Sequence, residues 1–126
     1  DTDSWEQRMS QALEELKGVV YRYVKNQGLG FTIPYELDGE THQYVPDFIV
    51  DIEDGHGPDD PLHLVIEVTG KNDRAKQAKT DTARTLWVPA VNNTGRYGRW
   101  HFVEITDPWD GANVVASIAH AGAVTA

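Results

Sequence analysis

The sequence contains no cysteine, few basic residues and no long apolar run. Without cysteine, the chain forms no disulfide, no thiolate metal site and no thiol nucleophile. No apolar run approaches the ~18 residues of a membrane-spanning helix, and the first residues are too polar for a secretory signal. We therefore expect no membrane partner and a cytoplasmic location.

Basic charge is scarce, with 11 Lys and Arg against 20 Asp and Glu, which gives a net charge of −9. A chain this acidic attracts the phosphates of nucleic acid poorly by itself, because basic contacts dominate that affinity. The 126 residues are 40% hydrophobic, which suffices for one domain with its own core and not for two ordinary ones. Because the first residue is Asp rather than Met, we expect an excised domain or a processed product.

Hydrophobic periodicity predicts the elements of the first half. Apolar residues spaced by three and four predict one amphipathic helix from Trp5 to about Asn26. Residues 31–35 then alternate, Asp38-Gly39 is typical of a hairpin turn, and residues 43–52 form the expected return strand. Pro46 predicts a bend or bulge within that strand.

The second half predicts an α/β domain. Residues 62–68 form a nearly continuous apolar strand, which is typical of a central position in a sheet. Residues 73–85 favour a helix, and residues 86–91 are expected to form a buried strand parallel to 62–68. A last strand is expected at 100–105, and a short helix after Ala112. The predicted order is α-β-β-β-α-β with appendages.

Two acids lie inside apolar strand sequence. Asp47 follows Val45-Pro46, and Glu67 lies within Val65-Ile66-Glu67-Val68. A carboxylate in such a position is costly to bury unless it is paired or binds a metal. The two predicted strands are consecutive, so the two acids and the Val68 carbonyl predict a Mg²⁺ site. The alternative is that either acid is exposed or is held by an arginine.

The arrangement resembles the PD-(D/E)xK nuclease superfamily, whose core order is α-β-β-β-α-β. Further segments resemble the C-terminal endonuclease domain of the restriction subunit of type III restriction-modification enzymes, over nearly all of residues 4–109. They are SWEQR, LGFTIPYE, YVPDFI, LVIEVTG, TLWVPAVNN and GRWHFVEITDP. The resemblance implies a restriction-endonuclease-like fold with a mixed central sheet flanked by helices, and a C-terminal fragment of a larger chain.

The resemblance also implies an activity and its partners. The chain would be a Mg²⁺-dependent DNA endonuclease domain of bacterial defence, with Mn²⁺ tolerated. Asp47 and Glu67 would bind the metal, and Glu6 matches a position where many superfamily members place a further acid. The alternative for Glu6 is a first-turn acid favoured by the helix dipole. Double-stranded DNA would be reached through a helicase-like motor in the same parent chain and a modification methyltransferase.

One position departs from the family pattern. Two residues after Glu67 the motif expects Lys, and this sequence has Thr69, which supplies a hydroxyl but no charge. Lys71 lies nearby, and Lys76 and Lys79 share a face of the predicted helix, where Gln77 could orient water. We favour Lys76 as the replacement; the alternative is that both helix lysines form a solvated face.

A loop near the C-terminal strand mixes basic and aromatic residues. Arg96, Tyr97, Arg99 and Trp100 follow Asn92-Asn93, a composition typical of contacts with phosphates and bases. We expect Arg96, Arg99 and also Lys79 to contact DNA. The alternative is an ordinary turn with Trp100 in the core.

Two other functions stay open at this point. Thr69 favours a catalytically inactive nuclease-like module with a structural or interaction role. The loop DGHGPDD favours a small Ca²⁺- or ligand-binding domain, although it lacks the ligand register and terminal Glu of a calcium loop.

Overall fold

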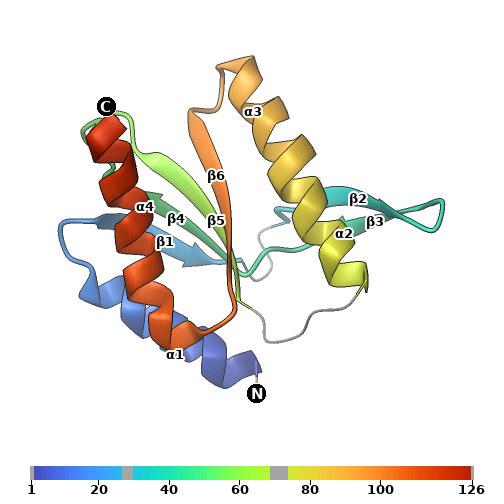
Figure 1. The fold of residues 1–126 in the computed structure, drawn as a ribbon, viewed down its shortest axis with the longest axis horizontal. Helices are drawn as coiled ribbons and strands as arrows, with labels where there is room; N and C mark the ends of the chain where they lie inside the picture. Colours follow the sequence, from blue (N-terminus) through green and yellow to red (C-terminus); the bar gives the residue numbers. More distant parts are fainter. Residues whose placement is uncertain (1, 27–29, 69–73, 126) are drawn as a thin grey trace.

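The computed structural model describes residues 2–26, 30–68 and 74–125 and has an α/β architecture with a mixed sheet (Figure 1). The main sheet has the strand order β1-β4-β5-β6, formed by β1 (Val20–Lys25), β4 (Phe48–Ile52), β5 (Leu62–Val68) and β6 (Arg99–Ile105). β4 pairs antiparallel with both β1 and β5, whereas β6 is parallel to β5. A separate hairpin consists of β2 (Ile33–Leu37) and β3 (Glu40–Tyr44).

Helices cover both faces of the main sheet. α1 (Thr2–Glu15) and α4 (Gly111–Thr125) pack on one face, against apolar side chains that include Leu64 and Ile66. The other face meets α2 (Arg74–Thr82), the π-helical turn η1 (Ala83–Trp87), α3 (Val88–Thr94) and the root of the hairpin. The short 3-10 helix η2 (Pro108–Asp110) joins β6 to α4. Among the described residues, no helix is long and apolar enough to cross a membrane.

The alternation of β5 determines where Glu67 points. Leu64 and Ile66 are fully buried in the cluster beneath α1 and α4, and Val65 is fully buried in the cluster on the opposite face. Because side chains alternate along a strand, Glu67 shares the face of Val65. The predicted central strand 62–68 is thus confirmed, with its acid on the side of the hairpin and α2.

The first predicted helix is too long. α1 ends at Glu15, and residues 20–25 form β1 instead of continuing the helix. Gly18 adopts a left-handed conformation (φ +89°), which breaks the helix. The residues that follow are β-branched and aromatic, and β4 offers them a pairing partner, so the strand is preferred over the helical period.

The predicted strand 86–91 is wrong, because these residues are helical in η1 and α3. A short apolar run does not distinguish a buried strand from a buried helix. Trp87 and Val88 pack on the sheet from a helix, while Leu86 is 65% exposed. The parallel partner of β5 is therefore β6, and the whole helical segment 74–94 forms the crossover.

The hairpin turn at Asp38-Gly39 is confirmed, with left-handed φ values of 54° and 78° at these residues. The predicted return strand 43–52 divides at Pro46 into β3 and β4, which belong to different sheets. Figure 1 shows the hairpin projecting from the body beside α2. The helix expected after Ala112 is confirmed as α4.

Candidate functional site

Asp47 directly precedes β4, and Glu67 lies near the end of the adjacent strand β5. The antiparallel register pairs Phe48 with Ile66, and one more step along it places Asp47 opposite Glu67. Side chains opposite each other on neighbouring strands have Cβ atoms ~5 Å apart. The structure therefore brings together the two acids that the sequence singled out, and both are half-buried.

The segment that carries Asp47 is held by hydrogen bonds. The Val68 backbone N–H donates to Asp47 Oδ2 at 2.8 Å. Asn26, only 5% exposed, donates from its backbone N–H to the Asp47 carbonyl at 2.9 Å and from Nδ2 to the Pro46 carbonyl at 3.0 Å. These bonds fix both the backbone and the carboxyl group of Asp47. The bend predicted at Pro46 thus positions a site residue.

Glu67 is held from the hairpin. The Tyr44 hydroxyl donates to Glu67 Oε1 at 2.6 Å, and Tyr44 is 2% exposed. The Lys79 ammonium lies 5.7 Å from the centre of the Tyr44 ring. The carboxylate is therefore bordered by a hydroxyl donor and by a cation from α2.

Burial and mutual repulsion raise the pKa values of both acids. Removal from water is the main reason that the pKa of Glu67 rises to about 7, followed by the charge of Asp47; Tyr44 and Lys79 oppose the rise. Removal from water likewise raises the pKa of Asp47 to about 6, opposed by the Val68 N–H and reinforced by Glu6. Neighbouring acids with raised pKa values are typical of functional sites, since a cation bound between them would relieve the repulsion.

Glu6 joins the site from α1. Its carboxyl group contacts that of Asp47 and also pairs with Lys25 Nζ at 3.3 Å. The role of Glu6 as a further acid of a metal site stays a prediction, as does the helix-dipole interpretation. Asp47 stands between Glu6 and Glu67.

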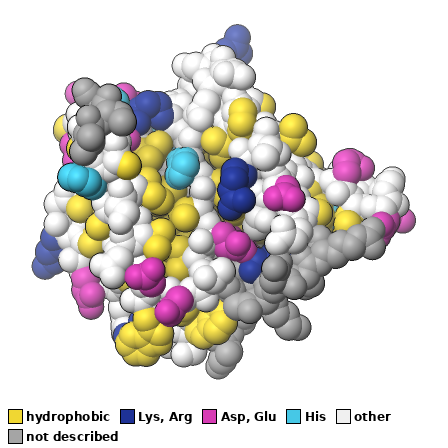
Figure 2. All heavy atoms as spheres, in the orientation of Figure 1, with side chains coloured by type: hydrophobic (Ala, Val, Ile, Leu, Met, Phe, Trp, Pro, Cys, Tyr) yellow, Lys and Arg dark blue, Asp and Glu magenta, His cyan; other side chains and the backbone are white. Residues whose placement is uncertain are grey.

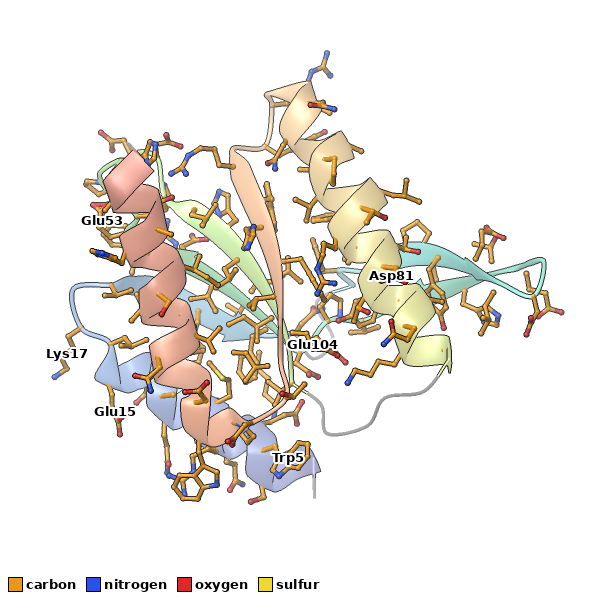
Figure 3. The ribbon with its side chains drawn as sticks, in the orientation of Figure 1. Trp5, Glu15, Lys17, Glu53, Asp81 and Glu104 are labelled. Carbon is orange, nitrogen blue, oxygen red and sulfur yellow. The ribbon has the colours of Figure 1, made fainter. Side chains whose placement is uncertain are left out.

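Lys76 is buried against a further acid. Its Nζ lies 2.7 Å from Glu104 Oε2, and the parallel register places Glu104 beside Glu67. Figure 3 shows Glu104 between the end of β6 and α2. Both helix lysines thus face the acidic end of the sheet: Lys76 through Glu104, and Lys79 through its direct effect on the pKa of Glu67. Gln77, between them, is exposed on α2.

Some predicted site residues cannot be placed. Thr69 and Lys71 lie outside the described residues, so their predicted roles stay predictions. Val68 contacts Asp47 through its N–H, and the predicted role of its carbonyl as a metal ligand likewise stays a prediction.

The predicted DNA-contact loop lies away from the acids. Arg99 begins β6 and Glu104 lies five residues further along the strand, a separation of ~16 Å at ~3.3 Å per residue. Arg99 donates to both carboxylate oxygens of Asp54 at 2.7 and 2.8 Å and to Asp60 at 3.2 Å. Its charge is therefore balanced by the loop that the sequence suggested for Ca²⁺. Arg96 is exposed.

The aromatic and amide residues of that region have structural contacts. Trp100 stacks on Phe31 with ring centres 6.0 Å apart and contacts Trp87 edge-on at 5.4 Å. Asn92 bonds both the N–H and the carbonyl of Trp100, at 2.8 and 2.9 Å. These contacts correspond to the alternative in which Trp100 belongs to the core. Tyr97 is 61% exposed beside it.

The donor set fits a small divalent cation with two protein carboxylates. Among residues 2–26, 30–68 and 74–125, no three Asp, Glu or His side chains are arranged to hold a metal ion by themselves. Mg²⁺ commonly takes only one or two carboxylates and completes its shell with water and substrate phosphate. Asp47 and Glu67, which are adjacent and half-buried, are two carboxylates of the kind that such a site needs.

Several residues of the site were missed by sequence reasoning. Tyr44, Asn26, Lys25 and Glu104 contact the acids or their neighbours only because the chain folds. A signal existed for Tyr44 alone, which precedes Val45-Pro46-Asp47 directly. Lys25 and Asn26 lie in or directly after β1, where a helix was predicted. Glu104 lies in the predicted strand 100–105, but its place beside β5 was expected for residues 86–91.

Comparisons of the chain with family models, with curated proteins and with solved structures find no match. The function is therefore inferred from the geometry of the site.

Proposed function

We propose that this chain is a Mg²⁺-dependent DNA endonuclease domain that hydrolyses phosphodiester bonds. The observation that carries the proposal is the convergence of Asp47 and Glu67 from adjacent strands, with pKa values raised to about 6 and 7. Two half-buried acids side by side repel each other, and such an arrangement serves a metal site better than it serves stability.

The topology supports a restriction-endonuclease-like core. With the hairpin β2–β3 taken as an insertion, the order is α1, β1, β4, β5, the helical crossover and β6. This is the order α-β-β-β-α-β of the superfamily that the sequence resembles, although from other segments than the sequence predicted. The antiparallel β1-β4-β5 unit followed by parallel β6 gives the mixed sheet.

Asp47 and Glu67, with the Val68 carbonyl, would hold Mg²⁺ or Mn²⁺. Bound there, the ion would supply an activated water and stabilise charge on the attacked phosphate. Two contacts of Asp47 favour binding of a cation. The Val68 N–H fixes one Asp47 oxygen, and Glu6 places further negative charge beside Asp47.

The motif expects a lysine at the position of Thr69. A cationic group from α2 would take the place of that lysine. Lys79 is the helix lysine whose charge lowers the pKa of Glu67, and Lys76 neutralises the neighbouring Glu104. We expect Lys79→Ala or Lys76→Ala to slow DNA cleavage at least tenfold in the parent enzyme. Unchanged cleavage in both variants would exclude a helix lysine from the reaction.

Targeting would come from outside the domain. The net charge is −9, and Figure 2 shows basic and acidic side chains interspersed over the described part of one face, without a continuous basic patch. A tethered domain can act despite weak intrinsic affinity, because the tether raises its effective concentration on DNA. A helicase-like motor in the same parent chain and a methyltransferase partner, as in type III restriction enzymes, would provide that tether.

The second candidate is a catalytically inactive nuclease-like module. Thr69 favours it, because the motif position lacks a cation. Retention of metal binding distinguishes the two candidates, since a module without activity has no need of two repelling acids.

The first test is calorimetric titration of the chain with Mn²⁺ and Mg²⁺, with Asp47→Asn and Glu67→Gln as site variants and Glu15→Gln as a surface control. Binding that is lost in both site variants and kept in the control supports the nuclease. Binding that persists in both site variants would contradict it. Cleavage of plasmid DNA by the parent enzyme and its Asp47→Asn variant then tests activity itself.

A further inference from the structure

We propose that Tyr44 is a positioning residue that orients Glu67 for the metal, an inference that rests on the proposed function. Its hydroxyl donates to Glu67 Oε1 at 2.6 Å. A carboxylate with one oxygen engaged in this way keeps its other oxygen for an ion, in a defined orientation. Hydrogen bonds of this kind to metal-binding groups commonly change metal affinity 10- to 100-fold on removal.

The hairpin is anchored so that this contact is rigid. Tyr44 pairs with Ile33 across β2 and β3, and both are buried, at 2% and 0% exposed, in the cluster that contains Val65 and Phe102. Val65 and Glu67 share one face of β5. The hairpin root therefore lies over the strand that carries Glu67, and the hydroxyl is directed at its carboxylate.

Tyr44 also links the elements around the site. Asp47 follows it by three residues, and the intervening Pro46 is buried and bonded to Asn26. Lys79 of α2 lies over the Tyr44 ring. The Tyr44 side chain thus contacts Glu67 and Lys79, and Tyr44 is also the first residue of the segment that ends in Asp47.

The Tyr44 hydroxyl acts as a hydrogen-bond donor, because its partner is a carboxylate oxygen of Glu67. Its contribution is orientation of the carboxylate.

The test compares Tyr44→Phe with Tyr35→Phe by Mn²⁺ calorimetry, with the melting temperature of each metal-free variant measured alongside. Tyr35 is a matched control, since it lies on β2 of the same hairpin, is 7% exposed and stacks on His42 instead of contacting the acids. We expect Tyr44→Phe to weaken Mn²⁺ binding 10- to 100-fold and Tyr35→Phe to change it less than twofold. The two variants should fold equally well.

Equal Mn²⁺ affinity of Tyr44→Phe and wild type would overturn the inference and leave the proposed function intact. Equal weakening in both variants, with lowered melting temperatures, would also overturn it, because the effect would then be structural. A wild-type chain that binds no Mn²⁺ would instead overturn the proposed function and this inference with it.

Discussion

Replacement of Glu67 by Gln should make the metal-free chain more stable at high pH. The pKa of Glu67 rises from 4.5 to about 7 on folding, so the folded state binds its proton more tightly than the unfolded state. The stability associated with this group is fully present below pH ~4.5 and is lost as the pH rises through ~7. Gln carries no charge and keeps an oxygen for the Tyr44 hydroxyl, so the variant avoids the loss.

The rise from 4.5 to about 7 corresponds to about 3 kcal/mol at ~1.4 kcal/mol per pKa unit. Asp47 shares the repulsion and water screens part of it, so we expect a gain of about 1–3 kcal/mol at pH 8. The entropy of unfolding is ~2.1 cal/mol/K per residue, or about 0.26 kcal/mol/K for 126 residues. A change of 1 kcal/mol in the free energy of unfolding therefore shifts the melting temperature by about 4 °C. The expected gain is therefore about 4–12 °C.

The assay is thermal unfolding of both proteins at pH 5 and pH 8, without metal and then with Mg²⁺. The gain of Glu67→Gln should be large at pH 8 and should shrink at pH 5. Glu15→Gln is the control, because Glu15 lies exposed at the end of α1, away from the site (Figure 3). Added Mg²⁺ should stabilise wild type and not the variant. A variant no more stable than wild type at pH 8 would refute the raised pKa of Glu67, and with it the burial of this acid beside Asp47.

Two further changes test the scaffold. Asn26→Ala removes the Nδ2 bond to the Pro46 carbonyl at 3.0 Å and should cost about 1–3 kcal/mol in urea unfolding, since it leaves a buried acceptor unpaired; a loss below about 0.5 kcal/mol would contradict the structure. Arg99→Met leaves the buried Asp54 carboxylate without its main partner and should cost about 2–4 kcal/mol at pH 7. Because Arg99 lowers the pKa of Asp54 below 3.8, that stability is present above pH ~4 and is lost as the pH falls through the lowered pKa. A penalty that stays constant down to pH 2.5 would count against this ion pair.

The two acids of the site were predictable because each lies within apolar strand sequence, where a buried carboxylate is energetically costly. Asp47 and Glu67 interrupt apolar strand sequence, and that local cost is visible without any tertiary contact. Tyr44 had one local signal, its place directly before Val45-Pro46-Asp47. Lys25 and Glu104 were not predictable, because they are ordinary residues in their own segments. The choice between Lys76 and Lys79 also needed the fold, since both share one helix face in the sequence.

The elements show the same division. The strand 62–68 and the Asp38-Gly39 turn follow from local signals that are strong by themselves. Residues 20–25 and 86–91 were assigned incorrectly, because short apolar runs suit either a helix or a strand until a partner is present. Residues 20–25 pair with β4 as a strand. Residues 86–91 are helical and pack through Trp87 and Val88 against the cluster that contains Phe102 of β6.

The sequence by itself determined an acidic, cysteine-free α/β chain with two costly acids on consecutive strands. Only the tertiary structure decided what surrounds those acids: antiparallel pairing set them face to face, Asn26 and Val68 held one, and the hairpin brought Tyr44 to the other. Strand register and helix placement arise from contacts between distant segments, which no local pattern encodes. The sequence therefore predicted the acids of the site, and the fold supplied the groups that position them.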